Sequence, residues 1–453
     1  MAPLKALVLS VGCIAGLAAS AQNIQLKRAK SFTVEQSGGR SVTKLRGNVV
    51  LQSPEGVFTC DSADWFRNES RFFAYANVRF QGKDGMTVRS RTLEHLNGEN
   101  YFAGGVTVVD GDQRLETASL RYSTQSRKGQ FSQPATVTTR DGRLTCRRGE
   151  FSGATYRFLG SVHWLGSEER VHSEVMEYDA DARTARFPQG GTAVTDGDSV
   201  AFGQGRAQLQ GNRYLQLRGG VQGWGSARSF TAEQLERWTD LDRTRWTGSA
   251  HLTDWEKDST EIWAEVLTIT PDSLTARDQA AVRMPSWSGK AEMWRGHRTD
   301  SVYVLEGNPV IWSGPYQILA EYFTLMQRGP GDSLWAQGGV HLGEEADSAG
   351  RSNQMAAEAL QAQLRGRHVA RMELETNAQA LYYPGSTGDG PVSRMKSARI
   401  VLRFADDGTV DTVEFLPSSN GSTAREDAPS YLPGYLDRWG ERPSSTDAMS
   451  GRK

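Results

Sequence analysis

Histidines are the side chains of this 453-residue chain best suited to binding a metal or moving a proton near neutral pH. The seven stand at His95, His163, His172, His251, His297, His341 and His368. No two of them have the His-x-x-x-His spacing of a zinc-binding helix, and none forms a Cys-His ligand spacing with a cysteine. We interpret them as exposed residues on alternating strands, and the pattern predicts no metal site.

Carboxylates are abundant but mark no catalytic pair. Asp110–Asp112 and Asp196–Asp198 both read Asp-Gly-Asp, yet the nonapeptide of calcium-binding solenoids and the EF-hand loop are missing from the sequence. Acid–glycine pairs also supply the positive φ of tight hairpin turns, which is the interpretation we favour. A glycan-cleaving β-helix would need one carboxylate pair with a raised-pKa acid. That hypothesis stays open, although the sequence singles out no such pair.

Other catalytic signatures are missing from the sequence as well. There is no Gly-x-Ser-x-Gly elbow, no phosphate-binding loop and no dinucleotide-binding fingerprint. We therefore predict that the protein is not an enzyme and uses no cofactor. The chain carries 52 basic and 53 acidic residues, a formal net charge of −1, so it has no global electrostatic reason to bind nucleic acid.

The first 21 residues resemble an export signal. Lys5 supplies a positive charge, residues 6–18 are largely apolar, and Ala19-Ser20-Ala21 is a small-x-small cleavage site. The apolar run is shorter than a membrane span. We predict cleavage before Gln22 and export of the mature chain to the periplasm, with association with the outer membrane left open.

Apolar positions recur with a period near 29 residues. Short segments in which Val or Leu follows a small residue or Asn run from Val49 to Val340 in ten steps, which predicts about eleven units. The members between are Val78, Val106, Val137, Val162, Val194, Val221, Leu252, Val282 and Val310. A unit of this length cannot bury an apolar face alone, so stacking must bury a continuous row. The repeat predicts one elongated, solenoid-like all-β body.

Within the units, apolar and polar residues alternate with period two, so each strand has one apolar face. A helical pattern fits poorly, and Ala356–Leu364 is the one segment for which a helical turn stays open. We predict that the apolar row is lined by Val49, Leu51, Val78, Phe80, Val106, Val108, Val162, Trp164, Val282, Met284, Val310, Trp312, Val340 and Leu342. Such a row is suited either to forming a closed core or to holding acyl chains. The periodicity of the sequence does not distinguish between these two arrangements.

A second series of small residues alternates with the first. Cys60 and Cys146 both occupy its small position, which falls at 60, 90, 117 and 146 and holds Ala, Ser or Thr in other units. Three strand spacings separate them by at least ~14 Å, whereas a disulfide needs Cα atoms about 4.4–6.8 Å apart. We therefore predict two free, buried thiols and no disulfide.

Three stretches together resemble the OstA-like (organic solvent tolerance) family. They are Leu45-Arg-Gly-Asn-Val-Val-Leu51, Thr59-Cys-Asp-Ser-Ala-Asp-Trp-Phe66 and Ala76-Asn-Val-Arg-Phe80. The closest resemblance is to long members of the Bacteroidota type, with further similarity in residues 377–415. The resemblance implies a V-shaped β-jellyroll, or β-taco, that holds the acyl chains of lipopolysaccharide. It also implies end-to-end stacking, with other lipopolysaccharide-transport proteins at the ends, and no catalytic residues.

These observations lead to one hypothesis and one alternative. The hypothesis is a periplasmic lipopolysaccharide-binding scaffold that holds acyl chains of lipid A in an apolar groove and helps carry lipid to the outer membrane. Head-to-tail self-association of the chain is compatible with this hypothesis. The alternative is a structural or adhesive β-solenoid with a closed core. The expected organisation is a signal peptide at 1–21, the repeat array at 22–350, C-terminal repeats or a cap at 351–416, and a Pro- and Ser-rich disordered tail at 417–453.

Overall fold

The computed structural model describes residues 24–443 apart from short gaps. The described ranges are 24–37, 40–166, 169–195, 197–209, 213–255, 259–297, 299–327, 332–365, 368–384, 391–406, 409–424 and 430–443. The predicted signal peptide at 1–21 lies outside them. Within the described ranges, no helix is both long and apolar enough to cross a membrane.

The described residues fold almost entirely into strands, which cluster in two compact units. Unit 1 comprises residues 1–167 and 175–181, and unit 2 comprises residues 168–174 and 182–453. Unit 1 contains β1 (Gln25–Arg28), β2 (Ser31–Ser37), β3 (Arg40–Gln52), β4 (Gly56–Phe66), the 3-10 helix η1 (Arg67–Glu69), β5 (Arg71–Gly82), β6 (Thr87–Leu96), β7 (Glu99–Asp110), β8 (Gln113–Ser123), β9 (Lys128–Phe131), β10 (Ala135–Thr138), β11 (Arg143–Cys146), β12 (Arg148–Ser152) and β13 (Thr155–Leu165).

Strand β14 (Glu169–Asp179) is divided between the two units. Unit 2 continues with β15 (Thr184–Phe187), β16 (Gly191–Thr195), β17 (Asp198–Phe202), β18 (Gln204–Gln208), β19 (Tyr214–Trp224), β20 (Arg228–Trp238), η2 (Thr239–Leu241), β21 (Arg243–Asp254), β22 (Thr260–Ile269), β23 (Ser273–Arg283), β24 (Ser288–His297), β25 (Val302–Glu306), β26 (Val310–Ser313), β27 (Tyr316–Leu319), β28 (Tyr322–Met326), β29 (Ser333–Glu344), β30 (Gln354–Arg365), β31 (His368–Tyr382), β32 (Val392–Phe404), β33 (Val410–Ala424) and η4 (Trp439–Glu441).

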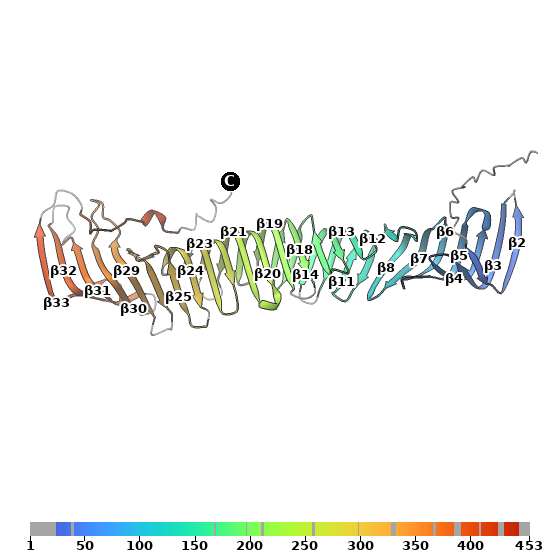
Figure 1. Cartoon of the computed structure of the whole chain (residues 1–453). Helices are drawn as coiled ribbons and strands as arrows, with labels where there is room; N and C mark the ends of the chain where they lie inside the picture. Colours follow the sequence, from blue (N-terminus) through green and yellow to red (C-terminus); the bar gives the residue numbers. More distant parts are fainter. Residues whose placement is uncertain are drawn as a thin grey trace, which may run out of the picture. The chain divides into compact units, whose positions relative to one another are not determined.

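In each unit the strands pair antiparallel, and Figure 1 shows the long strands side by side within each unit. Most pairs join strands that follow one another in the chain, but some short strands pair across others, as β8 does with β10 and β25 with β28. The all-β prediction is therefore confirmed. The helical option for Ala356–Leu364 is wrong, because this segment is the middle of β30. There Leu360 pairs with Ala336 on one side and with Leu374 on the other. Ladder bonds on both edges override the helix propensity of its Ala and Glu residues.

A row of directly paired apolar residues crosses each unit, and we call it the first row. Paired residues of an antiparallel ladder point to the same face, so each row is one continuous surface. In unit 1 it consists of Leu51, Phe58, Phe80, Val88, Val108, Leu115, Val137, Leu144 and Trp164. In unit 2 it consists of Val171, Ala193, Val200, Gly223, Phe230, Leu252, Ile262, Val282, Gly289, Ile311, Ile318 and Leu342. All of these residues are buried.

The other half of the long strands carries a second apolar row. In unit 1 its members are Leu45, Ala63, Ala74, Leu93, Phe102 and Leu120. In unit 2 its members are Leu217, Leu235, Trp246, Leu267, Ala276, Trp294, Leu305, Phe323, Ala336, Leu360, Leu374 and Ile400. These residues are buried as well. Each unit thus buries two parallel apolar rows in its core.

A two-residue β-bulge separates the two rows on every other long strand. Both residues of the bulge have positive φ, and two residues oppose one on the neighbouring strand. The first bulge residues Gly47, Ala76 and Gly104 are 29 and 28 residues apart, so the bulge recurs with the predicted period. Side chains of the adjacent segment, either within a strand or between two short strands, lie directly over several of the bulge glycines. These side chains are Lys30, Arg91, Arg147, Glu233, Glu292 and Glu321.

Both described cysteines are free and buried, Cys60 in β4 and Cys146 in β11. Burial raises the pKa of each thiol to about 11. They therefore stay protonated at neutral pH and pack as small apolar side chains.

The interpretation of the histidines as exposed is wrong for His95, which lies in the core of unit 1 with 1% of its surface exposed. Its ring stacks on Phe72, and its Nδ1 lies 2.8 Å from Oδ1 of Asn100. Because the Asn100 amide nitrogen donates to the carbonyls of Gly98 and Tyr122, Oδ1 is the acceptor and Nδ1 carries the proton. Nε2 has no hydrogen-bond partner among the described residues. Burial lowers the pKa of His95, and the Asn100 hydrogen bond opposes that shift only in part.

The lowered pKa predicts that unit 1 loses stability in acid. The fold keeps His95 neutral, so its contribution is complete above the ordinary pKa of 6.5 and falls by at most about 1.4 kcal/mol per pH unit below it. Hydrogen exchange of the β6 and β7 amides from about pH 7.5 to about pH 5, corrected for intrinsic exchange, measures this loss. His95→Gln is expected to reduce the pH dependence, whereas the exposed His297→Gln is expected to leave it unchanged. An unchanged slope in His95→Gln would contradict the assignment.

Candidate functional site

The residues predicted from the sequence to line an apolar row lie almost entirely in the core. Thirteen of the fourteen are at most 5% exposed: Val49, Leu51, Val78, Phe80, Val106, Val108, Val162, Trp164, Val282, Val310, Trp312, Val340 and Leu342. Met284, the remaining one, is partly exposed. Most of them lie on or next to the first row.

Val310 and Trp312 differ from the others because they lie on the opposite face of the sheet. Ile311 pairs with Gly289 and Ile318 in the first row. Trp312 pairs with Ser288 and Gln317 instead. A shift of one residue moves a side chain to the other face of a strand, so the first row passes through Ile311. We call the row Ser288, Trp312, Gln317, Gly343, Gln354 and Leu381 the outer row.

Unit 2 contains a cavity of about 750 Å³ against the first row. Met284, Trp287, Ile318, Met372 and Phe404 form its apolar wall. These residues come from the ends of β23 and β24 and from β27, β31 and β32. The volume lies within the range of about 300–1,000 Å³ that ligand pockets of proteins usually have.

A narrower cavity of about 70 Å³ adjoins the larger one. Trp287, Ile318, Val369 and Met372 line both. Ile311, Leu325, Leu334, Ala362 and Leu364 form the rest of its apolar wall. Ser286, Ser313, Gln327 and Asp332 also line it. The lining of the two spaces together is predominantly aliphatic and aromatic.

Arginines stand at the rim of the larger cavity. Arg283 forms an ion pair with Glu261, and the guanidinium of Arg442 donates to the carbonyl of Gly314 at 3.3 Å. A cavity with apolar walls and cationic groups at its mouth can hold an apolar chain that ends in an anionic group.

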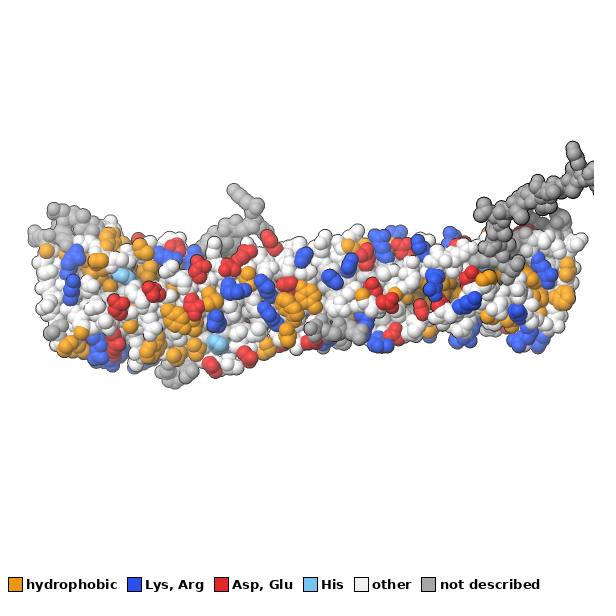
Figure 2. Space-filling view, in the orientation of Figure 1, with side chains coloured by type: hydrophobic (Ala, Val, Ile, Leu, Met, Phe, Trp, Pro, Cys, Tyr) orange, Lys and Arg blue, Asp and Glu red, His pale blue; other side chains and the backbone are white. Residues whose placement is uncertain are grey.

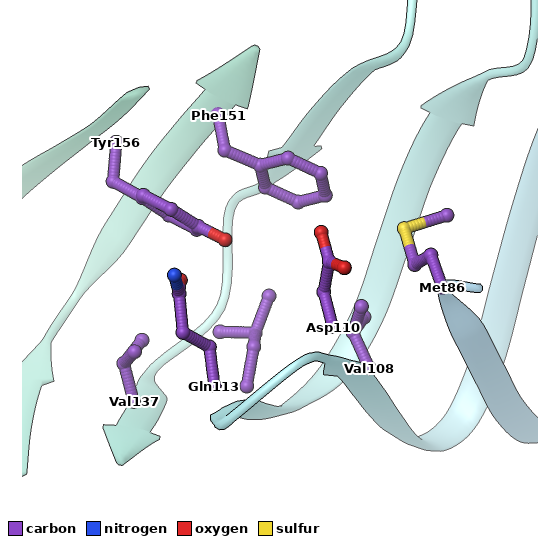
Figure 3. A pocket seen from close by; sticks show the side chains of 8 residues that line it. Met86, Val108, Asp110, Gln113, Val137, Phe151 and Tyr156 are labelled. Carbon is purple, nitrogen blue, oxygen red and sulfur yellow. The ribbon is translucent and has the colours of Figure 1, made fainter. Parts of the chain in front are cut away.

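Unit 1 contains a small cavity in its first row, of about 10 Å³, which is room for roughly one water molecule. Figure 3 shows the carboxyl of Asp110 and the hydroxyl of Tyr156 beside it, together with Val108 and Phe151. Burial raises the pKa of Asp110, and the nearby carboxylate of Asp84 adds to this shift. A raised-pKa carboxyl is what a glycan-cleaving site requires, but this space is too small for a sugar ring.

The described residues contain no group of three His, Cys, Asp or Glu side chains placed to hold a metal ion. On the face seen in Figure 2, Lys and Arg side chains are interspersed with Asp and Glu side chains, with hydrophobic patches between them.

Sequence reasoning found one wall residue of the larger cavity, Met284, and missed the rest. Trp287 and Tyr316 follow turns, where the alternation of apolar and polar residues does not predict to which face of the sheet a side chain points. Val369, Met372 and Phe404 belong to β31 and β32, beyond the best-preserved part of the repeat. Ile311 carried no signal of its own, because Val310 and Trp312 on either side of it are also apolar and matched the repeat better.

Comparison with known families gives one match. Residues 21–174 match the family described as OstA-like protein. The match includes most of unit 1 and ends before the cavities of unit 2. None of the curated proteins matches the chain.

Proposed function

Residues 21–174 are a domain of the OstA-like family, and from this membership we propose that the protein binds lipopolysaccharide and takes part in its transport to the outer membrane. The proposed location is the periplasm, reached through the signal peptide at 1–21, and the proposal includes contact with the outer membrane. The proposed role is non-catalytic and uses no cofactor. Lipid A supplies the acyl chains, and other lipopolysaccharide-transport proteins are the proposed partners.

The continuous first row is the observation that carries this proposal. In each unit, directly paired apolar side chains follow one another strand after strand, without a charged residue between them. An acyl chain laid along such a row gains about 0.8 kcal/mol for each buried methylene group. Because neighbouring positions are chemically alike, the lipid can move along the row at little cost.

The cavities of unit 2 support the same proposal. They are spaces in which the first row is not closed by other side chains. We propose that acyl chains occupy this space first, with the anionic head group toward Arg283 and Arg442 at the rim.

A structural β-solenoid with a closed core is the second candidate function. The observation that favours it is the burial of the predicted row residues, none of which is more than 5% exposed apart from Met284. In that case the rows serve only to stack the strands, and no lipid enters.

Photocrosslinking in cells separates the two functions. A photoreactive residue at Leu51, Val108, Trp164 or Ile311 is expected to crosslink to lipopolysaccharide. The same residue at Trp312, on the opposite face from Ile311, is the matched control and is expected to give no adduct. Mass spectrometry of the purified protein identifies the lipid. Absence of adducts at all four first-row positions would favour the closed core.

The proposed head-to-tail contacts would use the terminal strands. Among the described residues, β2 pairs only with β3, and β33 pairs only with β32. Phe32 is 66% exposed on β2, and Val410 is 41% exposed on β33. Unpaired edges with exposed apolar side chains invite another strand. Sedimentation at rising protein concentration tests the association, and a strictly monomeric protein would count against it.

A further inference from the structure

Residues 430–443 form an irregular segment that lies across the outer row of unit 2, and we call it the C-terminal strap. Figure 1 shows it in dark red, crossing the strands of unit 2 instead of adding one. Leu432-Pro-Gly-Tyr435 makes a tight turn, in which the Tyr435 amide donates to the Leu432 carbonyl at 3.1 Å and Gly434 has φ +84°. The sequence analysis expects disorder over 417–453, but β33 continues to Ala424 and the strap is packed against the sheet.

Two buried glutamines of the outer row hold the strap by its backbone. Gln317 donates from Nε2 to the Leu436 carbonyl at 2.8 Å and accepts from the Arg438 amide at 2.8 Å. Gln354 accepts from the Leu432 amide at 2.8 Å. Their exposed fractions are 0% and 1%. A buried side-chain amide that lacks hydrogen-bond partners is destabilising, because it has lost its hydrogen bonds to water. The two glutamines therefore form a binding site for an extended segment, which we call the seat of the strap.

Gly343 lies between the two glutamines in the same row and makes room for the strap. It pairs with Gln317 on one side and Gln354 on the other. A Cβ added at Gly343 would lie 2.5 Å from the Tyr435 ring, so this aromatic ring packs directly on the glycine backbone. A side chain at position 343 is therefore incompatible with the docked strap.

The two ends of the strap have different environments. Leu432 is buried in a small cluster with Ala356, Leu381 and Val392. At the other end, Arg438 donates to the Asn308 carbonyl at 2.9 Å, and Arg442 donates to the Gly314 carbonyl. These contacts bracket β26, which explains why Val310 and Trp312 are fully buried although they face away from the first row.

The last residues of the strap reach the mouth of the larger cavity. Arg442 and the buried Pro443 are part of its wall, beside the β26–β27 turn. The strap therefore connects the seat on the outer row to the entrance of the space proposed for acyl chains.

The strap is held by side-chain contacts and not by strand pairing. None of its described residues joins the ladder of a neighbouring strand. Tyr431 and Leu436 are 51% and 62% exposed. Segments with few buried apolar contacts open at a lower free energy than the core, so the strap can leave its seat while the sheet stays folded.

We propose that the C-terminal strap is a gate, which closes the side entrance of the unit 2 cavity when it is docked on Gln317, Gly343 and Gln354 and admits an amphipathic lipid when it is released. This proposal rests on the proposed lipid-binding function. It assigns a regulatory role to the C-terminal segment of the same site.

Uptake kinetics of an environment-sensitive fluorescent fatty acid with a single acyl chain test the gate. Gly343→Leu unseats the strap by filling the place of the Tyr435 ring. Gly440→Leu is the matched control, because a Cβ at Gly440 meets no atom within 4 Å. Tyr435→Ala, a change on the strap itself, releases it without altering the sheet. Hydrogen exchange of residues 430–443 reports the release in every variant.

The expected result is uptake about tenfold faster or more in Gly343→Leu and Tyr435→Ala than in the wild type and Gly440→Leu, which corresponds to at least about 1.4 kcal/mol of docking free energy. The final fluorescence is expected to be the same. Equal rates in all four proteins, with the strap shown to be released, would overturn the gate and leave lipid binding in place. No uptake by any of them would overturn lipid binding and the gate together.

Discussion

Trp312→Ala is expected to lower the free energy of unfolding of unit 2 by about 3–5 kcal/mol, the usual cost of removing a buried aromatic side chain. The indole is fully buried between Ser288 and Gln317 on the outer row. Without it, the surface under the strap is left with a cavity, so the strap is expected to become less protected as well. Urea unfolding followed by circular dichroism gives the free energy, and hydrogen exchange reports the strap.

Trp335→Ala is the matched control for this change. Trp335 lies on β29 of the same unit and is 41% exposed, so its replacement is expected to cost less than about 1 kcal/mol. The strap amides are expected to keep their protection in this variant. A cost at Trp312 no larger than that at Trp335 would contradict the burial of Trp312 beneath the strap.

Gly104→Ala is expected to destabilise unit 1 by about 2–4 kcal/mol. Two effects add at this position. Gly104 has φ +84°, a conformation that costs a side-chain-bearing residue about 1–2 kcal/mol. Its new Cβ would also lie 2.7 Å from Cβ of Arg91, and neither atom can move without shifting a strand.

Gly105→Ala separates the two effects, because Gly105 is the other residue of the same bulge. Its φ is +87°, yet a Cβ there meets no atom within 4 Å. Only the conformational cost of about 1–2 kcal/mol should remain. Equal unfolding free energies for the two variants would show that contact with Arg91 contributes nothing.

Period-two alternation was sufficient to predict the all-β fold and most of the first row. Leu51, Val108 and Val282 were placed on the correct face because each has a polar residue on one side, which is Gln52, Thr107 or Arg283. The resemblance to the OstA-like family, drawn from residues 45–80 and 377–415, is confirmed over residues 21–174, and over residues 377–415 it stays a prediction. The jellyroll shape and the number of units stay predictions.

Alternation fails at β26 because that strand is apolar on both faces. Val310, Ile311 and Trp312 are all buried, so no polar residue marks the outside. Strand β26 has two buried faces because the strap covers one of them. The contact between Gln317 and Arg438 joins residues 121 positions apart, and no local pattern predicts a hydrogen bond over that distance.

The prediction of disorder over residues 417–453 failed at residues 430–443 for a related reason. Residues 430–443 are poor in aliphatic side chains, and composition of that kind is typical of disorder. Their anchoring depends mainly on hydrogen bonds from their own backbone to Gln317 and Gln354, and backbone groups are present in every sequence.

The bulges also determine how charge is distributed over the molecule. The side chains that lie over bulge glycines are Lys30, Arg91 and Arg147 in unit 1, and Glu233, Glu292 and Glu321 in unit 2. The net charge of −1 conceals this difference. The charges that pack over bulge glycines are thus of one sign within each unit, basic in unit 1 and acidic in unit 2.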